Sequence, residues 1–168
     1  MKNPIAAFGT LIVAVLAIFV GSQALFVVGQ TQRALVLTFG NSSDRVYGPG
    51  LHFKWPVAQS VIYLDNRILD VETSKQEVLA SDNNRIEVDS FLRYRIDDVL
   101  RFYQTVRTPQ GADSQLGNVL NSAVRRVLGE ANMTQIVRSQ RAQLMESIRK
   151  QVDAEAKKFG VTVLDVRI

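Results

Sequence analysis

The stretch R-I-E-V-D-S-F-L-R-Y-R-I, from Arg85 to Ile96, decides the fold class because apolar and charged side chains alternate along it. One face holds Ile86, Val88, Ser90, Leu92, Tyr94 and Ile96, and the other holds Arg85, Glu87, Asp89, Arg93 and Arg95. A period of two predicts a β-strand with one buried face, and the turn residues 81–84 before it predict the second half of an antiparallel hairpin. Phe91 is the one large apolar side chain on the charged face.

Shorter runs of strand-forming residues precede this strand. Strands are predicted at residues 33–39, 61–64, 68–71 and 76–79. The sequence G-N-S-S-D at residues 40–44 is expected to form a turn. Gly48-Pro49-Gly50 should interrupt the chain before a short extended segment at residues 51–56.

After Ile96 the apolar period changes from two to about 3.6, which indicates helices. Asp97 and Asp98 are placed to cap a first helix, whose apolar stripe is Val99, Leu100, Phe102, Tyr103 and Val106. After a loop at 108–111, residues 114–128 predict a second helix that Gly129 ends. Its apolar side chains are Leu116, Val119, Leu120, Ala123, Val124, Val127 and Leu128.

A third helix is predicted over residues 134–159, ended by Gly160 and followed by a closing strand at 161–168. Its apolar arc holds Leu144, Met145, Ile148, Val152, Ala156 and Phe159. Arg141 and Glu155 project toward that arc, either as side chains that reach water from its edges or as a place where another chain docks. Strands, then helices, then a final strand predict an α+β domain with a mostly antiparallel sheet backed by helices.

The N-terminal segment is uncharged over residues 3–32 and apolar over most of residues 5–28. Twenty-four helical residues would span roughly 36 Å, enough to cross a hydrocarbon layer of about 30 Å. We therefore expect residues 1–29 to form a short tail and a single transmembrane helix. Residues 30–168 should form one globular domain.

A cleaved signal peptide is the alternative interpretation of this segment, since Ser22-Gln23-Ala24 offers small residues at a possible processing site. The apolar run is longer than the core of a signal peptide and resumes at Leu25, which favours an uncleaved anchor. Charge does not orient the anchor, because Lys2 and the start amine on one side are balanced by Arg33 and Arg45 on the other.

Composition excludes several kinds of chemistry. The 168 residues include no cysteine and a single histidine, His52, so disulfides, a thiol nucleophile and thiolate or multi-imidazole metal sites are excluded. The 20 basic residues exceed the 16 acidic ones by too little to indicate nucleic-acid binding. No cofactor is expected.

Fragments of a serine acyl-enzyme motif occur, but in the wrong order. Ser147 to Lys150 matches S-x-x-K and Ser81-Asp82-Asn83 spells S-D-N, yet in penicillin-binding proteins S-x-x-K comes first and a K-T-G, missing here, follows. Ser147 and Lys150 are expected on the solvated face of the third helix. We predict no catalytic, cofactor-binding or metal-binding residue, and a chain that is not an enzyme.

His52 is interpreted as a hydrogen-bonded structural histidine, because no second imidazole or cysteine accompanies it. Gly48-Pro49-Gly50 is interpreted as a turn, since no helix N-terminus follows it to cradle a phosphate. The neighbouring aromatic residues Phe53 and Trp55 are candidates for packing near a membrane interface, where aromatic side chains are favoured.

Five motifs lie in one order along the chain: V-V-G-Q-T-Q-R-A-L-V-L-T-F-G at 27–40, G-P-G-L-H-F-K-W-P at 48–56, L-D-N-R-I at 64–68, V-D-S-F-L-R-Y-R-I at 88–96 and G-V-T-V-L-D-V-R-I at 160–168. Together they resemble the stomatin/prohibitin/flotillin/HflKC superfamily, also called SPFH or band 7. The resemblance implies an SPFH domain behind the N-terminal anchor.

Within that superfamily the chain resembles the HflC branch, because only residues 1–4 precede the apolar run, where the HflK branch carries a Gly/Pro-rich extension. The resemblance implies a single-pass protein of the bacterial inner membrane, with a cytoplasmic N-terminus and a periplasmic domain. It also implies a hetero-oligomeric ring or cage with an HflK-like partner, which regulates the ATP-dependent membrane protease FtsH by controlling substrate access.

Members of the HflC branch continue past the closing strand into a C-terminal helical assembly region, which this chain is expected to lack. Residues 30–168 alone are therefore expected to be monomeric or weakly associating. Two other functions stay open: a lipid-microdomain organising scaffold without a protease partner, and a membrane serine hydrolase.

Overall fold

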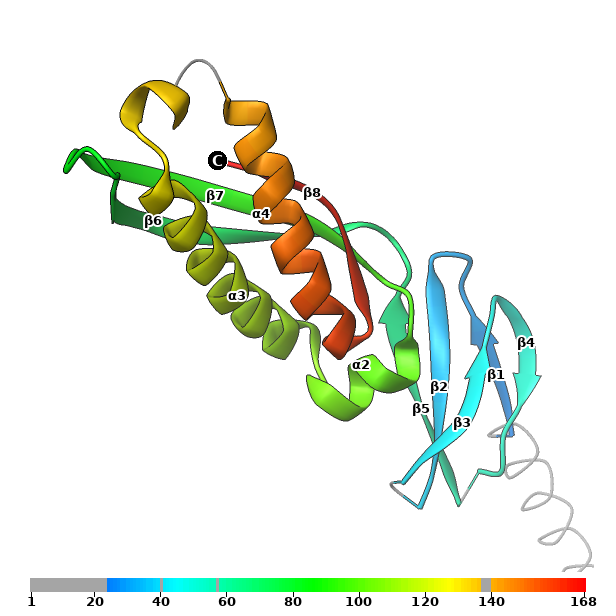
Figure 1. Cartoon of the computed structure of the whole chain (residues 1–168). Helices are drawn as coiled ribbons and strands as arrows, with labels where there is room; N and C mark the ends of the chain where they lie inside the picture. Colours follow the sequence, from blue (N-terminus) through cyan, green and yellow to red (C-terminus); the bar gives the residue numbers. More distant parts are fainter. Residues whose placement is uncertain (1–23, 40, 57, 137–139) are drawn as a thin grey trace, which may run out of the picture. The chain divides into compact units, whose positions relative to one another are not determined.

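The computed structural model describes residues 24–39, 41–56, 58–136 and 140–168 (Figure 1). Every strand pairing in these residues is antiparallel, so the predicted α+β class is confirmed. By its packing the chain divides after Asp65 into two compact units, a division that the sequence analysis did not predict. The elements are, in order, β1 (Leu25–Val28), β2 (Gln32–Thr38), β3 (Asn41–Tyr47), β4 (Gly50–Phe53), β5 (Gln59–Asp65), β6 (Leu69–Leu79), β7 (Arg85–Ile96), α2 (Val99–Thr105), α3 (Pro109–Glu130), α4 (Arg141–Ala156), the 3₁₀ turn η2 (Lys157–Phe159) and β8 (Val161–Arg167).

The N-terminal unit contains two small sheets, one ordered β3-β2-β5 and the other formed by β1 and β4. β2 is the central strand and pairs with β5 without a register shift, from Gln32 opposite Asp65 to Thr38 opposite Gln59. The core of the unit is small and apolar. One buried cluster consists of Phe26, Val28, Ala34 and Val36, against which Tyr47 and Val61 pack, and Leu35, Leu37 and Leu64 are also buried.

The C-terminal unit contains a sheet ordered β6-β7-β8, with the long predicted strand β7 at its centre. The alternation predicted from the sequence is confirmed, because Leu92, Tyr94 and Ile96 are fully buried while Arg93 and Arg95 between them are exposed. The predicted strands 68–71 and 76–79 are one strand, β6, which pairs with β7 and contains an irregularity between Thr73 and Gln76.

Helices α3 and α4 lie side by side across one face of this sheet (Figure 1). The buried face of α3 includes Leu116, Leu120, Val124 and Leu128, all at zero exposure. Helix α4 buries Ile148, Val152 and Ala156. Helical side chains at these spacings form one apolar stripe, and its burial against the sheet provides most of the stability of the unit.

Two polar side chains of β7, Ser90 and Tyr94, have hydrogen-bond partners inside the C-terminal unit. Ser90, a buried polar residue of β7, has its carbonyl oxygen 2.9 Å and its Oγ 2.8 Å from the Thr73 hydroxyl. The Tyr94 hydroxyl donates to Asp113 Oδ1 at 3.3 Å. Burial, followed by the nearby Asp113 charge, raises the pKa of Tyr94 above its ordinary value.

The predicted transmembrane helix is wrong at its C-terminal end. Leu25–Val28 form strand β1 and pair with β4, so a helix cannot continue to Val28 as expected. The physical reason is that these aromatic and β-branched side chains alternate between exposed and buried positions in a sheet. The rest of the predicted anchor, residues 1–23, lies outside the described residues. No helix in the described ranges has both the length and the apolar character needed to span a membrane.

Two local predictions in the remainder of the chain are also wrong. The predicted turn at residues 40–44 is mostly strand, because β3 starts at Asn41 and pairs directly with β2. The predicted loop at 108–111 is the first turn of α3. Thr108 caps this helix by accepting from the Gly111 amide at 3.1 Å, and Pro109 is favourable at the first helical position because it needs no amide donor.

The ends of the predicted helices need two further corrections. Gly129 does not end α3, which continues to Glu130. The predicted helix 134–159 is not continuous, because α4 begins only at Arg141, after Gln140 in a non-helical conformation. The Asp98 cap is confirmed, since its carboxylate accepts from the Arg101 amide at 3.0 Å.

Gly160 ends the helical region as predicted, and its backbone conformation and close neighbours leave no room for a side chain. Its φ is +74°, and an added Cβ would lie 2.5 Å from the Asp98 carbonyl oxygen and 3.0 Å from the Phe102 amide nitrogen. Gly160→Ala should therefore lower the free energy of unfolding by about 1 to 3 kcal/mol, from backbone strain and the clash. Urea denaturation measures the change. Gly48→Ala is the matched control, because open space surrounds that glycine, and an equal loss in both variants would contradict the assignment.

Candidate membrane-contact surface

The two-stranded sheet of β1 and β4 exposes one apolar face. Leu25 lies opposite Phe53 and Val27 lies opposite Leu51 in the antiparallel register, so these four side chains share a face. Each is between 54% and 67% exposed. We call these residues the β1–β4 face. Soluble monomers rarely expose contiguous apolar patches larger than a few hundred Å², and such patches mark sites of contact with proteins or membranes.

Two aromatic side chains extend the exposed apolar surface of this unit. Trp55 follows β4 and is 68% exposed, while Phe39 at the end of β2 is 85% exposed. Phe39 also has a φ of +50°, an uncommon conformation for a bulky residue that is found more often at functional positions. Phe53 and Trp55 were predicted from the sequence as interface residues, whereas Phe39 was not.

Hydrogen bonds hold these aromatic residues in place. The Trp55 amide donates to Gln59 Oε1 at 2.9 Å, and the Gln59 amide donates to the Trp55 carbonyl oxygen at 2.9 Å. The Phe39 amide donates to the Ala58 carbonyl oxygen, also at 2.9 Å. The Gln59 side-chain amide reaches Thr38 Oγ1 at 3.4 Å. Trp55 and Phe39 therefore project from two neighbouring, mutually bonded segments.

The opposite side of the β1–β4 sheet is packed and includes His52. Its ring lies 5.5 Å from the Phe26 ring and 4.9 Å from the Tyr47 ring, centroid to centroid. Its Nε2 is 2.8 Å from the Gly48 carbonyl oxygen. The hydrogen-bonded structural role predicted for His52 is confirmed. Phe26, Tyr47 and His52 form an aromatic cluster on one side of the β1–β4 sheet, and the β1–β4 face is its other side.

The first strand of the β1–β4 face follows directly after the apolar N-terminal segment in the sequence. Ala24, the first described residue, follows a run from residue 3 onward that contains no charge. The Ala24 carbonyl oxygen accepts a hydrogen bond of 2.7 Å from the Lys54 amide, which ties the start of the described chain to the segment between Phe53 and Trp55. The exposed aromatic and aliphatic residues thus lie at the point where the uncharged segment joins the folded unit.

The residues of the serine-enzyme motifs have ordinary structural roles. Ser147 is exposed on α4, and Lys150 on the same helix is 3.8 Å from Glu146. Ser81, Asp82 and Asn83 belong to the turn between β6 and β7. The Asp82 carboxylate accepts from the Met133 amide at 3.2 Å, and this bond is the main cause that lowers the pKa of Asp82. The described ranges contain no group of three or more His, Cys, Asp or Glu side chains arranged to hold a metal ion.

The structure is thus of the α+β class, and its N-terminal unit has an exposed apolar sheet face. The chain matches the model of the SPFH domain / Band 7 family over residues 26–168. It therefore belongs to the SPFH domain / Band 7 family, as the motif resemblance indicated.

Three individual relatives share between 29% and 31% sequence identity with this chain. HflC of Haemophilus influenzae is 31% identical over 159 residues, which cover 87% of this chain and 53% of the relative. HflC of Buchnera aphidicola subsp. Acyrthosiphon pisum is 29% identical over 171 residues, covering 88% and 54%. HflK of Buchnera aphidicola subsp. Schizaphis graminum is 30% identical over 173 residues, covering 98% and 39%. The chain spans about half the length or less of these relatives, and HflC and HflK match it at similar identity.

Proposed function

We propose that this chain is a membrane-anchored, non-enzymatic scaffold subunit of the HflC type. It assembles with an HflK-like paralogue into a hetero-oligomeric ring or cage, and it regulates an FtsH-like ATP-dependent membrane protease by controlling substrate access. Membership of the SPFH family and similarity to proteins named HflC and HflK support this proposal. The exposed β1–β4 face, next to an uncharged N-terminal run, is the observation that carries its membrane part.

The proposed topology is single-pass in the bacterial inner membrane, with the N-terminus in the cytoplasm and the SPFH domain in the periplasm. In this arrangement the β1–β4 face lies against the outer leaflet, where Trp55 and Phe39 occupy the interfacial zone that favours aromatic side chains. Protease added to intact spheroplasts should degrade the domain. Protection until the membrane is lysed would contradict this orientation.

The chain should resist extraction of membranes with alkaline carbonate. Thirty consecutive uncharged residues, 3–32, precede the first arginine of the domain, and transfer of such a segment into hydrocarbon is strongly favourable. Fractionation followed by immunoblotting measures the distribution between pellet and supernatant. Most of the chain should stay in the membrane pellet, whereas recovery of most of it in the supernatant would end the anchor hypothesis.

Purification from membranes distinguishes a scaffold that regulates a protease from a lipid-organising scaffold without a protease partner. The β1–β4 face is compatible with both functions. Detergent-extracted complexes carrying the tagged chain should have a high native mass and contain an HflK-like protein and an FtsH-like protease. A high-mass complex of this chain and lipid alone would favour the lipid-organising function. A Ser147→Ala variant is a useful control, because loss of any hydrolytic activity in it would revive the serine-hydrolase alternative.

A further inference from the structure

The N-terminal unit brings the ends of two strand pairs together. One end of the β1–β4 pairing is Leu25 opposite Phe53. One end of the β2–β5 pairing is Thr38 opposite Gln59. Trp55, which follows β4, joins the two pairs through two hydrogen bonds of 2.9 Å to Gln59. We call residues 24–25, 38–39, 53–55 and 58–59 the aromatic end of this unit.

Lys54 is the basic residue of the aromatic end. It stands between the exposed residues Phe53 and Trp55 in the sequence, and its backbone amide donates to the Ala24 carbonyl oxygen at 2.7 Å. The residue is partly buried, and among the described residues no carboxylate forms an ion pair with it. A lysine stem can lie along apolar surface while its ammonium reaches a polar phase. Lys54 therefore adds one positive charge to a surface that is otherwise aromatic and aliphatic.

The other basic residues between positions 24 and 65 are Arg33 and Arg45, and both lie away from the aromatic end. Arg33 is at the opposite end of the β2–β5 pairing, where the register reaches Asp65. Arg45 adjoins Val46, whose partner is Leu35 in the middle of β2. Lys54 is therefore the cation that the aromatic end brings to a bilayer.

The headgroup region of a membrane is complementary to this combination of side chains. Aromatic side chains are favoured at the level of the headgroups, and lysine or arginine serves beside them as an interfacial anchor. Basic residues close to the surface are also attracted to anionic lipids. A zwitterionic headgroup carries no net charge and offers a lysine less. The charge of Lys54 thus favours lipids with a net negative headgroup over neutral ones.

We propose that the aromatic end binds an anionic phospholipid, such as phosphatidylglycerol, through an ion pair between the Lys54 ammonium and the headgroup phosphate. Phe53 and Trp55 pack against the upper part of the acyl chains on either side of this ion pair. The proposal rests on the proposed contact of the β1–β4 face with a bilayer, and it adds which lipids that contact selects. Lys54 provides the selectivity, because the aromatic side chains contact the acyl chains of every phospholipid alike.

Trp55 reports on the lipids at the aromatic end, because it is the only tryptophan of the chain and adjoins Lys54. The full chain is reconstituted into phosphatidylcholine vesicles that contain, at equal mole fraction, phosphatidylglycerol or phosphatidylcholine brominated near the top of the acyl chains. Quenching of the Trp55 emission measures the relative association of the two brominated lipids. Phosphatidylglycerol should associate about fivefold more strongly, the effect expected of one basic residue at an anionic surface.

Three variants assign the preference to Lys54. Lys54→Gln keeps the backbone hydrogen bond to Ala24 and should bring the two lipids to equal association, whereas Lys54→Arg should retain the preference. Arg45→Gln, at an exposed arginine of β3, is the matched control and should also retain it. Circular dichroism verifies that all three variants fold. Equal quenching by both lipids in the natural chain, or a preference that Lys54→Gln leaves unchanged, would overturn the proposal. Absence of quenching by either lipid would instead contradict the membrane contact itself, and both proposals with it.

Discussion

Leu120→Ala is expected to lower the free energy of unfolding by about 2 to 5 kcal/mol, since Leu120 lies at zero exposure on the face of α3 that packs in the C-terminal unit. Removal of its buried methyl groups loses their transfer free energy and leaves a cavity that the neighbours fill only in part. Urea denaturation of the detergent-solubilised chain measures this loss, with far-ultraviolet circular dichroism as the probe.

Val119→Ala on the same helix is the matched control, because its side chain is only partly buried. Its cost should be less than half that of Leu120→Ala. Equal effects of the two substitutions would mean that the face of α3 assigned to the core is wrong.

Replacement of Val27 by Glu together with Leu51 by Lys should weaken vesicle binding of residues 24–168 at least tenfold, a loss of about 1.4 kcal/mol or more. The two residues are directly opposite each other in the β1–β4 pairing, so the new charges can pair and the strands remain compatible. The β1–β4 face nevertheless loses two apolar side chains and gains two charges that resist transfer from water. Sedimentation with vesicles of phosphatidylethanolamine and phosphatidylglycerol measures the bound fraction.

Leu79→Glu provides the control for added charge, because Leu79 is also an exposed apolar residue but belongs to β6 and lies opposite Arg85. It should not change vesicle binding. If the Val27 and Leu51 double variant binds as tightly as the natural sequence, the β1–β4 face does not contact lipid.

Local sequence signals were sufficient to predict the elements at the centre of the C-terminal unit. β7 was predicted with its correct bounds because strict alternation and a polar turn act within twelve residues. The cap at Asp98 and the end at Gly160 followed from equally local chemistry. The start of α3 was missed although Thr108 and Pro109 carry a cap-and-proline signal. The proline was interpreted only as a breaker.

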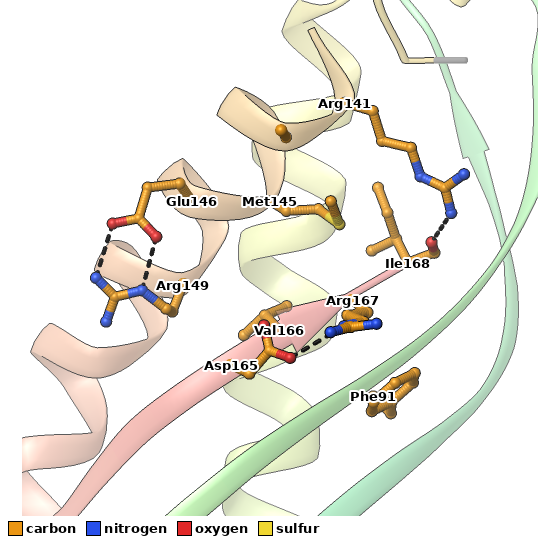
Figure 2. A pocket seen from close by; sticks show the side chains of 10 residues that line it. Phe91, Arg141, Met145, Glu146, Arg149, Asp165, Val166, Arg167 and Ile168 are labelled. Carbon is orange, nitrogen blue, oxygen red and sulfur yellow. Dashed lines mark hydrogen bonds and ion pairs between the residues drawn. The ribbon is translucent and has the colours of Figure 1, made fainter. Parts of the chain in front are cut away.

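Non-local pairing accounts for what the sequence could not provide. An apolar run that ends in Leu25–Val28 predicts one continuous helix. Only the pairing with β4 identifies its last residues as a strand. For the same reason Phe53 and Trp55 could be named as interface candidates, but their neighbours Leu25 and Val27 could not. Phe91 and Arg141 were recognisable as exceptions in their own elements, yet only the packing of α4 along β8 places them in one pocket beside the end of β8 (Figure 2).

Trp55 makes the central claim, that the β1–β4 face of this SPFH domain lies against a bilayer, directly measurable. It is the only tryptophan in the chain, and its side chain is 68% exposed in the structure. The full chain is reconstituted into vesicles that contain lipids brominated at defined depths along the acyl chain. The account predicts a blue-shifted emission that the shallowest brominated lipids quench most and that aqueous iodide quenches weakly. Emission typical of water-exposed tryptophan, quenched by iodide and unaffected by brominated lipid, would contradict it.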